Sequence, residues 1–336
     1  MDFDIFECGD IQLQCGDTLR DAKLAYKTYG TLARDGGNVV VMPTFFTGSH
    51  SRNEGFFGPG RALDPARHFI VSINLFGGGL SSSPSTTASR QEAGNFPAIA
   101  FQDNIAAQHR LLIGHLGVKK IALVLGWSMA GCQAYHWAVQ HPDLVLAILP
   151  FCASARTSPH NFVFLEGVKA ALCADTQWNN GDYGTQPVEG LKAFGRAYAG
   201  WAFSQSFYRN GRYRDLGYEN IADLLDDWAE DHARNWDAND LLAKIATWQA
   251  GDVSTGPEFE GNLEKALASI RARTILMPCA QDLYFPPEDN AYEAQHIPGA
   301  KFRPVLSEFG HCAANPGNDA GFTAQLDTNI AELLNA

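Results

Sequence analysis

The sequence predicts an α/β protein in which a helical insertion interrupts a mostly parallel, doubly wound sheet. Short, continuous apolar runs recur with helical patterns between them over residues 39–151 and 273–336, as expected of strands buried on both faces. Over residues 156–268 the strand signal disappears and helical patterns replace it. We therefore expect residues 1–155 and 269–336 to form one core, with residues 156–268 as a mostly helical lid.

Six strands are predicted from the apolar runs and the turn residues that separate them. They lie at residues 39–45, 68–75, 121–125, 145–151, 273–277 and 301–306. An alternating stretch at Ile11–Cys15 and the segment Lys23–Tyr29 predict an antiparallel pair at one edge of the sheet. Helical patterns include Phe101–Leu116, before the third of these strands, and Asn220–Arg234 in the insertion.

The composition favours a globular protein that acts on small molecules. Of the 336 residues, 46% are apolar, which is enough for a substantial core in one domain with an insertion. The formal net charge of −12 argues against nucleic acids and anionic membrane surfaces as partners. No apolar run approaches the length of a membrane span and the first residues are acidic, so we expect a soluble, cytoplasmic protein. The seven cysteines are scattered and never form metal-ligand pairs, which predicts reduced thiols and neither metal nor cofactor.

The most informative segment is an apolar strand that runs directly into a helical pattern. Residues 121–131 read Ile-Ala-Leu-Val-Leu-Gly-Trp-Ser-Met-Ala-Gly, with Ser128 at the apex of the turn. A sharp strand-to-helix turn exposes its middle side chain and requires small residues two positions before and after it, as Gly126 and Ala130 are. The pattern is typical of a nucleophile elbow and predicts acyl chemistry through Ser128. The N–H of Met129, at the start of the helix, is the expected first donor to an oxyanion.

A serine hydroxyl is a weak nucleophile near neutral pH, so Ser128 requires a histidine base and a carboxylate that orients it. Asp282 follows the predicted strand 273–277, and His311 follows the last predicted strand on a Gly-His loop. Both therefore lie past the carboxyl end of a strand, where doubly wound sheets place their catalytic groups. Asp289 is the alternative acid, in which case Asp282 would only cap a helix. The chain order Ser, Asp, His is that of the α/β-hydrolase fold.

A second oxyanion donor is expected from the loop after an early central strand. The strand Asn38–Met42 runs into Pro-Thr-Phe-Phe-Thr-Gly, in which the backbone N–H of Phe46 is the first candidate and that of Phe45 the second. The two phenylalanines would otherwise be core residues beside an ordinary turn. Because the donor is a backbone group, the identity of the side chain does not decide between these interpretations.

Several segments together resemble the homoserine O-acetyltransferase family of α/β-hydrolases, over nearly the whole chain. They are Leu24–Leu32, Phe46–His50, Gly58–Asp64 with Phe69–Val71, the glycine-serine loop Gly77–Pro84, the elbow Gly126–Gly131 and Trp236–Asn239. The resemblance implies a two-step reaction in which Ser128 takes up an acetyl group and an acceptor then removes it. It also implies a homodimer joined through the lid helices.

The chain departs from the family pattern beside the expected nucleophile and base. Where the transferases bind the homoserine amine with an acidic residue directly after the histidine, this chain has Cys312, and a thiol cannot supply the charge that an ammonium group needs. Trp127 and Ala130 stand where the transferases usually have glycine, so the pocket beside the serine is expected to be narrower. Phe45, Phe46, Trp127 and lid aromatics such as Trp201 or Phe203 would make the acyl and alcohol pockets small and apolar. Arg196 lies roughly where the family uses an arginine to contact the substrate carboxylate, and the alternative interpretation is a surface arginine.

Without a captured amino-acid acceptor, water is the default second nucleophile, and the resemblance includes a branch that hydrolyses short acyl esters. We therefore predict a serine carboxylesterase that hydrolyses short-chain acetate esters through an acetyl-enzyme, with Ser128, Asp282 and His311 as its triad. One alternative is a homoserine O-acetyltransferase that uses acetyl-CoA. The other is a hydrolase-fold binding protein without chemistry, because this scaffold hosts many functions.

Overall fold

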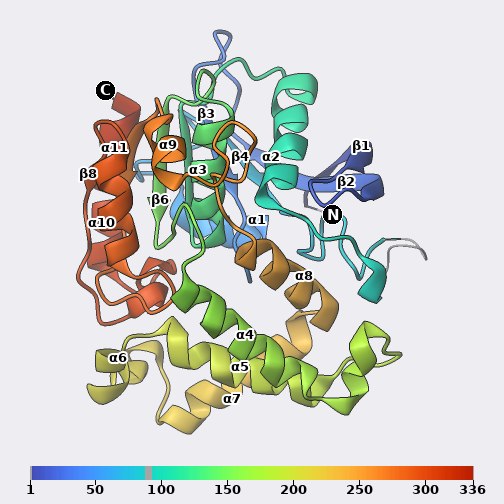
Figure 1. The fold of residues 1–336 in the computed structure, drawn as a ribbon. Coiled ribbons are helices and arrows are strands. Elements are labelled where there is room, and N and C mark those ends of the chain that lie inside the picture. The colour runs from blue at the N-terminus through green and yellow to red at the C-terminus, as the bar shows by residue number, and fades with distance from the viewer. Residues whose placement is uncertain (1, 88–92, 336) are drawn as a thin grey trace.

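The computed structural model describes residues 2–87 and 93–335, which form an eight-stranded sheet flanked by helices (Figure 1). The strands are β1 (Asp4–Gln12), β2 (Thr18–Tyr29), β3 (Val39–Pro43), β4 (Phe69–Ile73), β5 (Leu123–Trp127), β6 (Ala147–Phe151), β7 (Arg273–Leu276) and β8 (Lys301–Phe302). They lie in the order β1-β2-β4-β3-β5-β6-β7-β8. The β1·β2 and β2·β4 pairs are antiparallel, and the remaining pairs are parallel. The predicted α/β class, the mostly parallel sheet and the antiparallel pair at its edge are confirmed.

The strand order creates a crevice at the centre of the sheet. β3 is followed by β4 on one side, whereas β5 lies on its other side and is followed by β6 farther out. The loops after β3 and β5 therefore leave the same edge of the sheet in opposite directions, which makes this a topological switch point. Phe45 and Phe46 follow β3, and Ser128 follows β5, so the fold brings these predicted site residues to one crevice.

The central strands are apolar along their length because helices cover both faces of the sheet. Alternate residues point to opposite faces: Val40 belongs to one buried cluster and Val41 to the other. The first cluster includes Phe322, Leu326 and Ile330 of the C-terminal helix. The second includes residues of the two helices that precede and follow β5 in the chain. This two-sided burial explains why the strands could be predicted from continuous apolar runs.

The helices have the following bounds. They are α1 (His50–Asn53), α2 (Phe101–His109), α3 (Met129–Gln140), α4 (Pro159–Cys173), α5 (Val188–Ala202), α6 (Gln205–Arg209), α7 (Ile221–Asn235), α8 (Ala238–Gln249), α9 (Leu263–Ala268), α10 (Pro287–His296) and α11 (Ala320–Asn335). Shorter helical turns are η1 (Glu54–Phe56), η2 (Ala93–Asn95), η3 (Arg110–His115), η4 (Thr176–Gly181), η5 (Arg212–Leu216) and η6 (Gly310–Ala314). Within the described residues, no helix combines the length and the apolar character that crossing a membrane requires.

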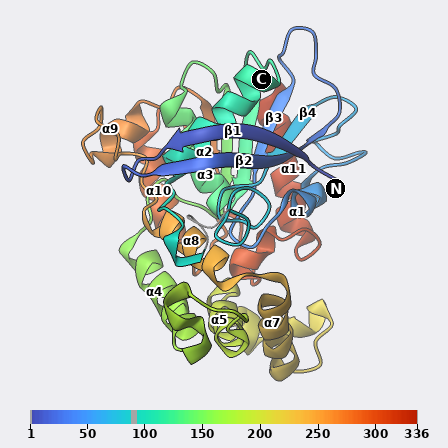
Figure 2. The same ribbon diagram turned by 90° about the vertical axis from the view of Figure 1, so that its right-hand side faces the viewer.

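Helices α4 to α9 occupy the chain between β6 and β7, and the described residues there form no further strand. In both views α4, α5 and α7 form a layer at one end of the molecule, with α8 between this layer and the sheet (Figure 2). The side chains of Ser158, Asn220 and Asp237 accept backbone N–H bonds at the starts of α4, α7 and α8. Local capping signals therefore set where several of these helices begin.

A buried carboxyl group anchors the point where the chain leaves the sheet for this helical layer. Glu293 of α10 accepts hydrogen bonds from the Ala155 N–H, the Asn290 amide and the Tyr135 hydroxyl. Burial raises the pKa of Glu293 to about 7, and the three donors partly offset this effect. The network joins the exit of β6 to α3 and α10, on the sheet side of the helical layer.

Three predicted strands have bounds that differ from those of the structure by more than two residues. β2 begins at Thr18 rather than at the predicted Lys23. The first strand covers Asp4–Gln12 rather than Ile11–Cys15, with an irregular register near Gly9 that weakens the alternating pattern. The last covers only Lys301–Phe302, and Val305 adds one isolated bridge to Cys279. Pro304 lies between them and has no N–H for a ladder bond, so the predicted strand 301–306 stops early.

Candidate active site

The turn after β5 holds Ser128 in a backbone conformation that side chains rarely adopt. Its φ and ψ angles are 59° and −130°, and its N–H donates to the Phe151 carbonyl at 3.1 Å. A Cβ atom at Gly126 would lie 2.4 Å from the Cβ of Ala130, so the crossing of strand and helix requires glycine at this position. Positive φ at a non-glycine residue costs about 1–3 kcal/mol and persists where the surrounding structure enforces it. The backbone conformation therefore confirms the predicted sharp turn with Ser128 at its apex.

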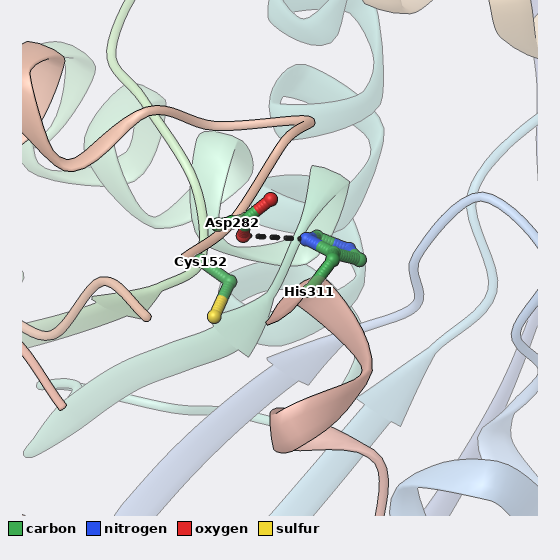
Figure 3. A group of neighbouring side chains, drawn as sticks. All are labelled: Cys152, Asp282 and His311. Carbon is green, nitrogen blue, oxygen red and sulfur yellow. Dashed lines mark hydrogen bonds and ion pairs between the residues drawn. The ribbon is translucent and has the colours of Figure 1, made fainter. Parts of the chain in front are cut away.

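Asp282 and His311 meet although 28 residues separate them in the sequence. The Asp282 Oδ2 atom lies 2.7 Å from His311 Nδ1, and both side chains are buried (Figure 3). The other carboxylate oxygen, Oδ1, accepts the backbone N–H groups of Tyr284 and Phe285 at 2.8 and 3.0 Å. These bonds fix the carboxylate, which in turn fixes the orientation of the imidazole. Asp289, the alternative acid, makes no contact with His311 among the described residues.

Cys152 lies beside this pair, at the end of β6, with a positive φ of 48° (Figure 3). One ligand atom from each of Cys152, Asp282 and His311 lies within 4.8 Å of the others, a donor set that zinc accepts elsewhere. Burial, however, raises the pKa of the Cys152 thiol well above its usual value, so the sulfur keeps its proton. The Asp282 carboxylate also already binds His311 Nδ1. The geometry therefore describes an Asp–His pair beside a neutral thiol.

Ser128 and His311 both line a cavity of about 580 Å³ beneath the helical layer. The lining residues come from strand-end loops and from the helices between β6 and β7: Phe45, Phe46, Thr47, Arg52, Trp127, Ser128, Tyr198, Ala202, Phe203, Leu216, Tyr218, Asp227, Trp228, Asp231, His232, Tyr284, His311, Cys312, Asn315 and Asn318. Within the described residues, the Ser128 hydroxyl forms no hydrogen bond to His311. Such contacts are commonly loose until a substrate tightens them.

Two backbone N–H groups lie close to Ser128 along the fold: that of Phe46, which lines the cavity, and that of Met129, which follows Ser128 in the chain but is not itself a lining residue. Met129 begins α3, so its N–H has no partner within the helix, and Phe46 lies in the loop after β3. In the part of the chain that the structure describes, neither N–H donates to another protein group. Both are thus free to donate hydrogen bonds to a negatively charged oxygen next to Ser128.

The predicted pocket residues Phe45, Trp127 and Cys312 also line the cavity. The rings of Phe45 and Trp127 lie 4.6 Å apart between centroids, and Trp127 lies 5.1 Å from the His311 ring. Cys312 is 8% exposed, and burial raises the pKa of its thiol to about 12. The residue after His311 therefore brings no charge to the cavity.

Arg196 does not reach the cavity, so the prediction that it contacts substrate is wrong. Its side chain is about half exposed and pairs with Asp226 of α7 at 2.9 Å. The buried face of α5 is formed by Leu191, Phe194 and Tyr198, and Arg196 lies on the opposite side of the helix. The surface alternative was the right one for this arginine.

The arginine that does line the cavity is Arg52, which the sequence interpretation missed. It donates to the Asn315 side chain at 2.6 Å and to the Thr47 carbonyl at 3.3 Å, and its guanidinium lies 5.3 Å from the Phe45 ring centroid. Its position in α1, two residues after the Phe46–His50 segment already assigned to the site, was the available signal.

The helical wall of the cavity was also missed, apart from Phe203. On α7 the residues at spacing i, i+1, i+4 and i+5 share one face, and here they are Asp227, Trp228, Asp231 and His232. A face that mixes acids and aromatic rings could have been noticed, but nothing local shows that it meets a strand-end loop. Trp201, the other lid aromatic considered, packs on His160 and Phe164 rather than lining the cavity.

Comparison with known proteins places the chain in a family. The family model described as "alpha/beta hydrolase fold" matches residues 37–314, and the chain belongs to that family. It is 35% identical over 339 residues to an ethyl acetate hydrolase of Pseudomonas veronii, covering 99% of this chain and 96% of that protein. The crystal structure of an acetylester hydrolase from Corynebacterium glutamicum matches with a TM-score of 0.96 and 33% identity, covering 99% and 96% of the two chains.

A transferase relative is more distant. The homoserine O-acetyltransferase of Trichormus variabilis is 31% identical over 319 residues, which cover 90% of this chain and 86% of that protein. The predicted resemblance to this family is thus confirmed, with proteins named as ester hydrolases more similar in sequence than this transferase.

Proposed function

We propose that the protein is a serine carboxylesterase that hydrolyses short-chain acetate esters through an acetyl-enzyme. The observation that carries the proposal is the single cavity that brings the strained Ser128 turn and the Asp282–His311 pair together. The similarity to an ethyl acetate hydrolase and to an acetylester hydrolase over almost the whole chain supports acetate as the acyl group.

In the first half of the reaction, Ser128 Oγ attacks the acetyl carbonyl while His311 Nε2 takes the hydroxyl proton. The carbonyl oxygen becomes an oxyanion, which the N–H groups of Phe46 and Met129 stabilise. When the tetrahedral intermediate collapses, the bond to the alcohol oxygen breaks and His311 returns its proton to that oxygen. The products are a free alcohol and an acetyl ester of Ser128.

In the second half, water takes the place of the alcohol. His311 removes a proton from the water as its oxygen attacks the acetyl carbonyl, and the same two N–H groups bind the new oxyanion. Collapse breaks the bond to Ser128 Oγ, which regains its proton from His311, and acetate leaves. Asp282 holds the imidazole with Nε2 towards the cavity and stabilises its cationic form in both halves.

The immediate surroundings of His311 support short esters rather than an amino-acid acceptor. Phe45, Trp127 and Tyr284 surround the region near His311 with aromatic surface. Cys312 is neutral, so the position after the histidine cannot balance a substrate ammonium group. These features favour water as the acetyl acceptor over homoserine.

Ser128→Ala tests the proposal directly. With ethyl acetate as substrate, release of acetate should fall by about 1,000-fold or more, because the residual rate would come from the oxyanion hole and binding alone. Ser51→Ala, which changes an exposed serine of α1, should keep wild-type turnover. Unchanged hydrolysis by Ser128→Ala would refute the mechanism.

A second assay separates the esterase from the transferase. Wild-type protein with acetyl-CoA should release little CoA thiol whether or not homoserine is present. Homoserine-dependent release of CoA faster than ester hydrolysis would favour the transferase instead.

We also propose that residues 156–268 act as a lid, that the protein is a homodimer joined through these helices, and that it works in the cytoplasm. The lid role is supported by the residues of α5 and α7 that line the cavity. Light scattering on the purified protein tests the dimer, and cell fractionation tests the location. A monomer at micromolar concentration would contradict the proposed assembly.

A further inference from the structure

A lysine from the helical layer lies buried against the loop that carries the proposed oxyanion donor. Lys244, in α8, is 0% exposed, and its Nζ donates to the Phe46 carbonyl. The Nζ atom also lies 4.2 Å from the centroid of the Trp236 ring and 5.2 Å from that of Phe46. These distances are typical of cation–π contacts. The environment of Lys244 is therefore mostly aromatic.

No carboxylate in the described residues lies within ion-pair distance of Lys244. The acidic group that interacts electrostatically with the amine is Asp240, one turn earlier on α8, whose oxygens accept the Ser85 N–H and hydroxyl. His232 of α7 is the other titratable group that interacts electrostatically with the amine. A buried ammonium without a carboxylate partner is costly, which is a common mark of a residue retained for function.

The loop after β3 has each of its three consecutive carbonyl groups held by one donor. The Thr44 carbonyl accepts from the Gln133 side chain at 3.0 Å, and the Phe45 carbonyl accepts from the Gly48 N–H at 3.1 Å. The Phe46 carbonyl accepts from Lys244. In a trans peptide the C=O and N–H groups point in opposite directions, so the Gly48 bond to the Phe45 carbonyl orients the Phe46 N–H. The Lys244 bond to the Phe46 carbonyl fixes the next peptide plane, and so holds the Phe46 backbone from its other side.

The three donors differ in origin. Gln133 belongs to α3 of the sheet core and Gly48 to the loop itself, whereas Lys244 comes from the helical layer. Lys244 is also the only one of these three that carries a charge. Its ammonium adds positive potential next to a site where an oxyanion would develop, in surroundings that screen it weakly.

We propose that Lys244 is a positioning residue for ester hydrolysis, which holds the Phe46 N–H in place for the oxyanion through the Phe46 carbonyl. The proposal rests on the proposed function, because it needs Phe46 as the donor. It gives a part in the reaction to α8, which contributes no residue to the cavity lining. It also gives the Trp236–Asn239 segment a role, since the Trp236 ring packs on the ammonium.

The charge of Lys244 should make this contribution depend on pH. Burial lowers the pKa of the amine from its usual 10.5 to about 7, with Asp240 opposing the shift. The ammonium is therefore present below about pH 7 and is lost as the pH rises above it, although a neutral amine can still donate a weaker hydrogen bond. The effect of replacing Lys244 should be largest in mildly acidic solution and smaller in alkaline solution.

Lys244→Met removes the donor and the charge while keeping most of the volume. We expect kcat for ethyl acetate to fall by about 10- to 100-fold, less than for deletion of an oxyanion donor, with KM changed by no more than about threefold. A trifluoromethyl ketone, whose serine adduct has an oxyanion, should bind more weakly by a similar factor. Lys244→Gln keeps a neutral donor and should fall between wild type and the methionine variant.

Thermal unfolding separates this role from a structural one. Because Lys244 is a buried charge without a carboxylate partner, Lys244→Met should unfold at the same temperature as wild type or higher. The ratio of wild-type to variant kcat should be larger at about pH 6 than at about pH 9. Lys192→Met, which removes a partly exposed α5 lysine paired with Glu230, is the matched control and should change neither quantity.

Two results would overturn the inference. One is a kcat for Lys244→Met within about twofold of wild type. The other is a lower kcat together with a lower unfolding temperature and a ratio of wild-type to variant kcat that does not vary with pH. Lost packing alone would explain that combination. If the methionine variant does not fold, Lys244→Gln is judged by the same measures. Residual activity of Ser128→Ala would instead refute the proposed function, so the two failures can be told apart.

Discussion

The cavity has two walls of different character, one formed by strand-end loops and one by helices. The strand-end wall holds Ser128, His311 and Phe46, and its geometry is fixed by the sheet and by backbone hydrogen bonds. The helical wall holds aromatic rings and two aspartates of α7, held by side-chain packing between helices. Rigid backbone suits chemistry, and exchangeable side chains suit the selection of substrates. The contrast suggests that changes in the first wall alter kcat and changes in the second alter specificity.

The largest effect is expected on the strand-end wall, from Asp282→Asn. The amide would offer an N–H or a weaker acceptor to His311 Nδ1, and the imidazole would lose the tautomer and the charge stabilisation that the reaction needs. We expect kcat to fall by about 100- to 10,000-fold while KM changes little. Steady-state kinetics with ethyl acetate measures both constants.

Asp289→Asn is the matched control for this change, because Asp289 lies seven residues later and makes no contact with His311 among the described residues. It should keep wild-type kcat. If Asp289→Asn were the damaging change and Asp282→Asn the harmless one, the strand-end wall would have been assigned to the wrong carboxylate.

A smaller effect is expected on the helical wall, from Trp228→Ala. Trp228 lines the cavity and packs against Tyr198, Phe203 and His232, so its removal enlarges the space for substrate. We expect kcat/KM for butyrate relative to acetate esters to rise by about tenfold, since each added methylene changes discrimination by a comparable factor. The kcat for acetate should stay within about threefold of wild type.

Trp201→Ala provides the comparison, because Trp201 lies nearby on α5 but does not line the cavity. Its acyl-chain preference should match wild type. A Trp228→Ala variant that lost acetate turnover without any change in preference would remove the distinction between the two walls.

The smallest effect is expected from Arg196→Ala, outside both walls. The side chain is half exposed and its ion pair with Asp226 faces solvent, so stability should change by no more than about 0.5 kcal/mol. The KM for ethyl acetate should be unchanged, whereas Arg52→Ala should raise it by removing hydrogen bonds to Asn315 and Thr47 at the cavity. An increase in KM for Arg196→Ala alone would restore the original interpretation of this arginine.

The two walls also differ in how far the sequence could predict them. Ser128 follows from a local steric rule, and Asp282 and His311 follow from their places after strands whose carboxyl ends share one edge. Parallel sheets bring such loops together whatever the details of packing. The proposed catalytic residues of the strand-end wall can therefore be predicted from the sequence.

The helical wall depends on which helix faces meet, and this is set by packing between segments distant in the sequence. The error at Arg196 illustrates the point. The apolar positions Leu191, Phe194 and Tyr198 mark the buried side of α5 and exclude Arg196 from it. The prediction for Arg196 instead followed its rough position relative to the family's arginine. The hydrogen bond from Lys244 to the Phe46 carbonyl joins residues 198 positions apart, and no local sequence pattern predicts it.

The most direct test is to stop turnover of a p-nitrophenyl acetate substrate within milliseconds and to locate the bound acetyl group by peptide mass spectrometry. We expect one acetyl group per chain, on Ser128, and none on Ser128→Ala. An acetyl group on Cys312, or substrate turnover with no acetylated protein at any time, would contradict the account.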